Sequence, residues 1–193
     1  MQPVPADRQL ITQGVQRRAS FSISKENAPW IKAILRDKIY TDKILAVIRE
    51  YAANAWDANR EAGRGDVPIE VTLPTELEPY LTIRDNGLGL SEDGVYLVFM
   101  EYGHSTKRTT NDAVGMLGIG SKAAFAYSDQ FVITSWHEGT KAIYNAALTD
   151  DDDCMTKLGE WPSDEPSGIE IKVPVAQSDI YAFEQRARNL FPY

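Results

Sequence analysis

Three polar side chains recur at helical spacing within the segment 42–61: Glu50, Asn54 and Asp57 fall at positions i, i+4 and i+7. On a helix this spacing places them on one side, in a stripe that is acidic at both ends and contains no Lys or Arg. Such a stripe is often only a solvated outer face. The alternative is a site: the amide oxygen of Asn54 suits a hard cation such as Mg²⁺, and a carboxylate one turn away at Glu50 could deprotonate an attacking water.

A second polar element, RDNGLG over 84–89, directly follows a segment with the pattern of a strand. Gly87 and Gly89 are spaced by one residue, which permits positive φ and a close approach of the backbone to a ligand. Asp-Asn-Gly is also a strong turn signal, so a plain strand-ending turn is the alternative. In the functional interpretation, Asp85 is a buried acceptor for an exocyclic amine. Adenine offers that amine, whereas guanine has a carbonyl there that would repel the carboxylate.

The third element is a glycine-rich loop, GMLGIG over 115–120. Glycine-rich backbone that leads into a helix forms an anion site, because free N–H groups and the helix dipole point at the ligand. It is neither a Rossmann fingerprint, since no strand directly precedes it, nor a P-loop, since the Ser-Lys pair that follows reverses the required order. The polar stretch before it, 103–108 with Ser105 and Lys107, is either a lid over phosphates or a surface loop. The phosphate-binding residues expected in the loop are Gly115, Met116, Leu117, Gly118, Ile119 and Gly120.

Hydrophobic patterning predicts the elements that must position these residues. A helix over 42–61, capped by Thr41 and ended by Gly63, has an apolar side that includes Ile48 and Trp56. Further strands are predicted over 21–24, 69–73, 80–84, 130–136, 141–147 and 168–173, and further helices over 29–35, 91–99, 120–127 and 180–190. Because 130–136 and 141–147 read as a hairpin and strands come in adjacent pairs, we expect an α+β sandwich. Helices would cover one face of a mixed, mainly antiparallel sheet.

Composition narrows the class of protein. A length of 193 residues, 43% of them apolar, suits one soluble domain. The net charge of −8 disfavours direct binding of nucleic acid. Cys154 is the single cysteine, and there is neither a signal peptide nor an apolar run of membrane-spanning length, so we expect a cytoplasmic protein. The acidic run 150–153 lacks the Gly and distal Glu of a calcium loop and is expected to be solvated.

Together and in this order, the three elements resemble the N, G1 and G2 boxes of the GHKL ATPases, which include DNA gyrase B subunits, heat-shock chaperones, sensor histidine kinases and MutL. The resemblance implies the Bergerat fold, a two-layer α/β sandwich with ATP between its helices and a flexible lid. It implies that Glu50 is the general base and Asn54 the Mg²⁺ ligand. Asp85 would read adenine, the loop 115–120 would bind phosphates, and Asp57 would line the polar wall of the pocket.

Three runs are similar to the N-terminal domain of phage rapid-lysis proteins of the RIIA type: IYTDKILAVIREYAANAWDA from Ile39, and the segments 102–139 and 167–175. Phage proteins of this type are much longer, so the chain resembles their nucleotide domain alone. The resemblance implies an ATP-binding domain over 19–193. The polar segment 1–18, with two prolines and no apolar period, is expected to be a flexible arm or an added strand. The resemblance also points to the cytoplasm of an infected host, with a host or phage protein, or a second copy of the chain, as partner.

The sequence differs from other members of the superfamily at two points that affect the expected binding and hydrolysis of ATP. Where many members carry Gly-Thr in a late strand, Gly168 is followed by Ile169, so that contact with the base is not expected. Hydrolysing members also take a Lys or Arg from a following domain, which these 193 residues do not contain. The leading interpretation is therefore a weak Mg-ATPase whose turnover is coupled to ordering of the lid. The alternatives are a nucleotide-gated binding module without significant turnover and, ranked last, a protein kinase.

Overall fold

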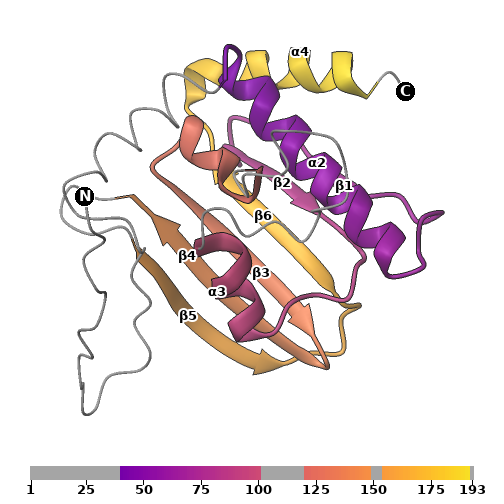
Figure 1. Ribbon diagram of the computed structural model, residues 1–193. Coiled ribbons are helices and arrows are strands. Elements are labelled where there is room, and N and C mark those ends of the chain that lie inside the picture. The colour runs from indigo at the N-terminus through magenta and orange to yellow at the C-terminus, as the bar shows by residue number, and fades with distance from the viewer. Residues whose placement is uncertain (1–39, 101–119, 149–153, 192–193) are drawn as a thin grey trace, which may run out of the picture.

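The computed structural model describes residues 40–100, 120–148 and 154–191, and its described strands form one six-stranded sheet (Figure 1). Every neighbouring pair is antiparallel, in the order β1-β2-β6-β3-β4-β5. The strands are β1 (Glu70–Thr72), β2 (Tyr80–Arg84), β3 (Gln130–His137), β4 (Thr140–Ala147), β5 (Cys154–Pro162) and β6 (Gly168–Pro174). The helices are α2 (Lys43–Glu61), α3 (Glu92–Met100), the 3₁₀ helices η2 (Gly120–Ala126) and η3 (Gln177–Asp179), and α4 (Ile180–Leu190).

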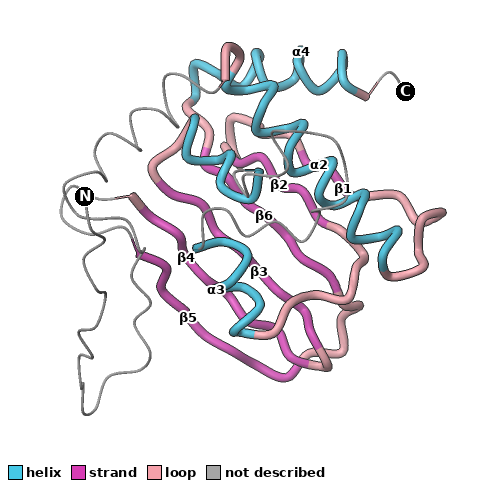
Figure 2. The backbone as a smooth tube through the Cα atoms, viewed as in Figure 1, coloured by secondary structure: helices cyan, strands magenta, loops and turns pink. Residues whose placement is uncertain are grey.

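The helices α2, α3, η2 and α4 cover the same face of the sheet (Figure 1). Figure 2 shows β6, which is formed late in the chain, lying between β2 and β3 at the centre of the sheet. The predicted α+β architecture, with helices on one face of an antiparallel sheet, is confirmed. Its sheet joins the segment after Arg84 to the segment before Gly168, although more than eighty residues separate them in the chain.

The core lies between that face of the sheet and the helices. Alternate side chains of the strands are buried toward it: Leu81, Ile83, Phe131, Ile133, Tyr144, Ile171 and Val173. The Phe131 ring is central, with ring centroids 6.2 Å from Tyr51 of α2, 6.2 Å from Phe99 of α3 and 5.0 Å from Phe125 of η2. Burying such a ring contributes roughly 1.5–3 kcal/mol, so this contact fixes three helices relative to β3.

Helix α2 has a cap at each end. Asp42, not the predicted Thr41, is the N-cap, and its Oδ1 accepts from the Leu45 amide at 3.0 Å. At the other end the Gly63 amide donates to the Arg60 carbonyl at 3.0 Å, and the Arg64 amide donates to the Asn59 carbonyl at 2.7 Å. These two bonds form the glycine-terminated motif that the sequence predicts at Gly63.

The β3–β4 hairpin turns at Glu138 and Gly139, with φ of 48° and 75°, as predicted from the sequence. Positive φ at both central residues is the geometry of a two-residue type I′ turn. The predicted strands before Arg84 and after Ser167 are confirmed, as are the helices 91–99 and 180–190, within a residue or two at their ends. The predicted helix after Gly120 is present, but as a 3₁₀ helix.

One strand was missed and one sequence-based expectation is wrong. Strand β5 was not predicted, because its apolar residues Met155, Leu158 and Trp161 fall three apart and do not alternate with polar ones. Trp56 does not belong to the apolar side of α2 and is 48% exposed. The predicted arm 1–18, strand 21–24 and helix 29–35 lie outside the described residues. No helix in the described part of the chain is long and apolar enough to cross a membrane.

Candidate functional site

The polar stripe of α2 lies between its buried and its exposed sides. Glu50, Asn54 and Asp57 are all partly buried. The exposed line of α2 runs instead through Arg49, Ala53, Trp56 and Arg60. A purely solvated face would coincide with that exposed line, so the geometry is more typical of side chains that border a site.

The first residue of η2 lies against this stripe. A Cβ added to Gly120 would be 3.0 Å from the Glu50 carboxylate oxygen Oε2 and 3.8 Å from Asn54 Nδ2. The Tyr51 hydroxyl holds η2 in place, because it donates to the Ser121 carbonyl at 3.1 Å and accepts from the Ala124 amide at 3.1 Å. Glu50 and Asn54 therefore face the end of the glycine-rich loop.

Gly120 is the one residue of the glycine-rich loop 115–120 within the described part of the chain. The predicted phosphate-binding residues Gly115, Met116, Leu117, Gly118 and Ile119 lie outside the described residues, as do Ser105 and Lys107 of the predicted lid. Of the third sequence element, the structure thus brings only Gly120 to the α2 stripe.

Glu50 has a basic neighbour. The Arg49 guanidinium lies 3.0 Å from Glu50 Oε1, and the side chains of Arg49 and Glu50 are 54% and 18% exposed. Exposed ion pairs of this kind are worth little in stability. This one nevertheless occupies one oxygen of the carboxylate and leaves Oε2 directed at Gly120.

Asp85, just past the end of β2, is buried, with 6% of its surface exposed. Its Oδ1 accepts from the Gly87 amide at 2.8 Å and from the Ile169 amide at 2.9 Å. Burial raises the pKa of the Asp85 carboxyl, while these two amides and the nearby Arg84 oppose that rise. Within the described part of the chain, no hydrogen bond reaches Oδ2, so that oxygen can accept from a ligand.

Two glycines allow the backbone to close around Asp85. A Cβ on Gly168 would lie 2.2 Å from the Asp85 carbonyl oxygen, closer than any side chain can approach. Gly89 has φ of 67°, and a Cβ there would lie 2.0 Å from the Trp136 carbonyl oxygen. Both positions therefore require glycine.

Asn59, which the sequence reasoning missed, fixes the loop after Asp85 to α2. It is fully buried; its Nδ2 donates to the Val67 carbonyl at 2.8 Å, and its Oδ1 accepts from the Asn86 amide at 2.6 Å. Nothing in its local sequence marks it, because it lies two residues past Asp57 on another side of the helix. Of its two partners, Asn86 is 27 residues away in the chain.

Arg64 was also missed, and it joins the two segments that flank Asp85. Its Nη1 donates to the carbonyls of Asn86 at 2.7 Å and Gly87 at 3.3 Å, and to Ser167 Oγ at 3.3 Å. Ser167 Oγ in turn donates to the Gly87 carbonyl at 2.9 Å. Arg64 and Ser167 therefore hold the loop after β2 against the segment before β6.

The two parts of the site lie along one helix. Gly87 contacts α2 at Ala58, since a Cβ on Gly87 would be 3.1 Å from the Ala58 Cβ. Glu50 is eight residues earlier on α2, which corresponds to about 12 Å along the helix axis. A ligand that spans both parts needs a hydrogen-bond donor at the Asp85 end and has to lie along α2 to reach Glu50.

The described residues offer few ligands for a metal ion. They contain no group of three His, Cys, Asp or Glu side chains that could hold a metal ion. A single amide oxygen at Asn54, one turn from Glu50, fits Mg²⁺ rather than a metal held in an all-protein cage. Mg²⁺ keeps several waters and is commonly bound through one or two protein oxygens together with phosphates.

The sequence profile of a known protein family matches most of this chain. The profile of a family described as histidine kinase-, DNA gyrase B-, and HSP90-like ATPase matches residues 43–173. The matched segment includes the α2 stripe, Asp85 and its glycines, the loop 115–120 and Gly168. A search of curated proteins gives no match.

Proposed function

The chain belongs to the family of histidine kinase-, DNA gyrase B- and HSP90-like ATPases, and from this premise we propose that it binds Mg-ATP along α2 and hydrolyses it slowly. Membership of the family implies ATP binding. The observation that carries the rest of the proposal is the placement of Glu50 Oε2 at 3.0 Å from the Cβ position of Gly120. Glu50, the candidate general base, therefore lies next to Gly120, the last residue of the expected phosphate-binding loop.

At the base end, Asp85 is proposed to accept the exocyclic amine of adenine through Oδ2. The Gly87 and Ile169 amides orient the carboxyl group through Oδ1. Guanine would place a carbonyl opposite Oδ2, and two facing acceptors in a buried site cost roughly 1–3 kcal/mol or more. The proposal therefore includes selectivity for adenine over guanine nucleotides.

At the phosphate end, Asn54 is the proposed protein ligand of Mg²⁺. The ion, when bound, would neutralise negative charge on the phosphates. The backbone that begins η2 at Gly120, with the loop before it, is proposed to contact the phosphates through N–H groups. Asp57, further along the same partly buried stripe, is proposed to line the polar wall of the pocket.

Glu50 is the proposed general base. Its Oε2 is directed at Gly120, where it could accept a proton from a water that attacks the terminal phosphate. The ion pair with Arg49 occupies Oε1 and restrains the orientation of the carboxylate. This restraint is the physical reason to expect slow turnover.

Calorimetric titration with ATP, ADP and GTP, with and without Mg²⁺, tests binding. We expect ATP and ADP to bind, ATP more tightly with Mg²⁺, and GTP to bind at least about tenfold more weakly. Binding of GTP as tight as that of ATP would contradict the role of Asp85. Absence of adenine nucleotide binding would overturn the proposal as a whole.

Phosphate release tests hydrolysis. Glu50→Ala should abolish turnover and leave ATP affinity intact, whereas Glu61→Ala, an exposed glutamate at the end of the same helix, should change neither. Wild-type protein that binds ATP without turnover would favour the nucleotide-gated binding module instead. The resemblance to phage rapid-lysis proteins of the RIIA type, and with it a host or phage partner, stays a prediction.

A further inference from the structure

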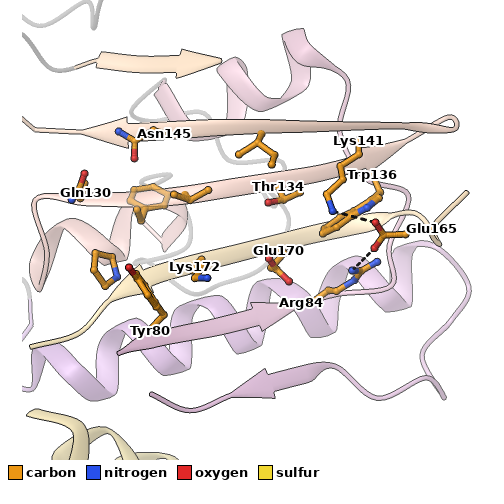
Figure 3. Close-up of a pocket in the computed structure, with 14 residues that line it drawn as sticks. Tyr80, Arg84, Gln130, Thr134, Trp136, Lys141, Asn145, Glu165, Glu170 and Lys172 are labelled. Carbon is orange, nitrogen blue, oxygen red and sulfur yellow. Dashed lines mark hydrogen bonds and ion pairs between the residues drawn. The ribbon is translucent and has the colours of Figure 1, made fainter. Parts of the chain in front are cut away.

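The sheet has a second face, opposite the helices, that no described element covers. Its side chains alternate with those of the core, and Figure 3 views them from this side, with α2 behind the sheet. We call it the open face, and it is hollowed by a groove of about 670 Å³. Residues that line the groove include Tyr80, Arg84, Trp136, Lys141, Glu170 and Lys172.

One end of the open face is already satisfied electrostatically. The Arg84 guanidinium lies 3.8 Å from the centre of the Trp136 ring and 3.4 Å from Glu165, and Lys141 pairs with the same carboxylate at 3.1 Å (Figure 3). The two cations share the Glu165 carboxylate and the Trp136 ring, so each of the three charges already has a partner, although together they carry a net charge of +1.

The middle of the open face is different, because two opposite charges there have no ion-pair partner among the residues that the structure describes. Glu170 and Lys172 lie two residues apart on β6, on either side of the buried Ile171. Glu170 pairs in register with Arg84 and Thr134, yet the Arg84 guanidinium is held toward Trp136 and Glu165. Lys172 lies over the Tyr80 ring, with Nζ 4.4 Å from its centroid.

A half-buried carboxylate without a partner is costly, and a cation from outside would relieve that cost. Burial raises the pKa of the Glu170 carboxyl, although Arg84 and Lys172 act to lower it. An occupant of the groove should therefore present a cation at Glu170 and an anion at Lys172. The spacing between these two charges should equal their spacing on β6.

A second copy of the chain meets this requirement. A two-fold axis between two open faces, running across the strands at the level of Ile171, would place Glu170 of each copy opposite Lys172 of the other. The same operation places Asn145 opposite Ile143, because the register aligns Glu170 with Thr134 and Ile143 in one row, and Lys172 with Val132 and Asn145 in the next. Each charge pair then occurs twice, as in any isologous interface.

We propose that the open face is a self-association surface, through which two copies of the chain pack sheet against sheet with reciprocal Glu170–Lys172 pairs. Six strands spaced about 4.8 Å apart and averaging about 23 Å in length give on the order of 550 Å² per copy. A standard stable interface buries about 800 Å² per partner, so the dimer should be weak. Because the nucleotide site lies on the other face of the sheet, association should not block ATP.

Sedimentation velocity of the full chain over about 5 µM to 1 mM tests this surface. Wild-type protein should shift from monomer to dimer over this range. Glu170→Lys and Lys172→Glu should each weaken association at least about tenfold, because each creates two like-charge contacts. Equimolar mixing of these two variants should restore association as a heterodimer, and so should the double exchange within one chain.

The mixing experiment separates a second copy from any other occupant. Only a reciprocal contact between copies predicts that two variants, each monomeric alone, associate together. Asn145→Arg, which would set a charge opposite Ile143 of the other copy, provides a variant on a different strand and should also weaken association. Urea denaturation measures whether each variant is folded, independently of nucleotide binding. A wild-type monomer throughout the range, or folded single variants that associate normally, would overturn the proposal.

Discussion

The Asp85 carboxylate is held by the Ile169 amide at 2.9 Å, although 84 residues separate them in the chain. The contact exists because β2 and β6 are antiparallel neighbours, so the end of β2 meets the start of β6. The Asp85 amide also donates to the Ile169 carbonyl at 2.9 Å, and Gly168 leaves room for this approach. The proposed adenine site is thus built at the junction of two strands and needs the complete sheet.

Asp85→Asn should separate folding from nucleotide binding. The asparagine Oδ1 can still accept from the Gly87 and Ile169 amides, and burial no longer penalises an ionised group, so the Tm without nucleotide should not fall. In place of Oδ2 stands an amide nitrogen, a donor that would face the amine of adenine. ATP affinity should therefore fall at least about tenfold in calorimetric titration. Unchanged ATP affinity would remove Asp85 from the site.

Arg64→Ala should loosen both walls of the adenine site at once. The substitution removes three donated hydrogen bonds, to the Asn86 and Gly87 carbonyls and to Ser167 Oγ. Because bonds from a charged donor are worth about 1.5–3 kcal/mol in favourable cases, ATP affinity should fall about tenfold. Arg64→Lys should restore little, since a point charge cannot bridge acceptors on two segments. The matched control is Arg60→Ala, on the exposed side of α2, which should bind ATP like the wild type.

Arg49→Ala should raise turnover if Glu50 is the base. Removal of the guanidinium at 3.0 Å frees Glu50 Oε1 and lets the carboxylate turn toward the attacking water. An exposed pair is worth up to about 1 kcal/mol, which corresponds to an increase in kcat of about two- to fivefold. The measurement is steady-state phosphate release at saturating ATP. A decrease in kcat would indicate instead that Arg49 assists the reaction.

The stripe of Glu50, Asn54 and Asp57 could be predicted because helical periodicity determines it locally. The hairpin turn at Glu138-Gly139 is local for the same reason. Asn59 and Arg64 could not be found in this way, since their partners lie on segments that only the folded sheet brings near. Strand β5 escaped prediction because Met155, Leu158 and Trp161 fall three apart, without the alternation by which strands are recognised.

Tyr51→Phe should destabilise the protein and disturb the Gly120 end of the site. The buried hydroxyl donates to the Ser121 carbonyl and accepts from the Ala124 amide, and phenylalanine would leave both groups unpaired. The free energy of unfolding should fall by about 1–3 kcal/mol. Urea denaturation gives this value, and Tyr181→Phe, at a tyrosine that is 70% exposed, should change it little. A neutral Tyr51→Phe would show that η2 is held by other contacts.

Asp42 should make stability depend on pH at the start of α2. The Leu45 amide above all, and then Arg186, hold the pKa of the Asp42 carboxyl below its usual value of 3.8, so its stabilising contribution is present above that pH. It is lost as the pH falls through the lower, folded-state pKa. Asp42→Ala should therefore cost about 1 kcal/mol near neutral pH, and the difference from the wild type should shrink in acid.

Asp42→Asn distinguishes the two partners of this carboxylate. Asparagine can still accept from the Leu45 amide as an N-cap, but it loses the charge that pairs with Arg186 of α4 at 2.6 Å. Because Asp42 and Arg186 are 35% and 42% exposed, the ion pair should contribute less than the cap. Urea denaturation near neutral pH should therefore place Asp42→Asn closer to the wild type than to Asp42→Ala. The reverse order would mean that the contact between α2 and α4, rather than the helix cap, dominates the contribution of Asp42.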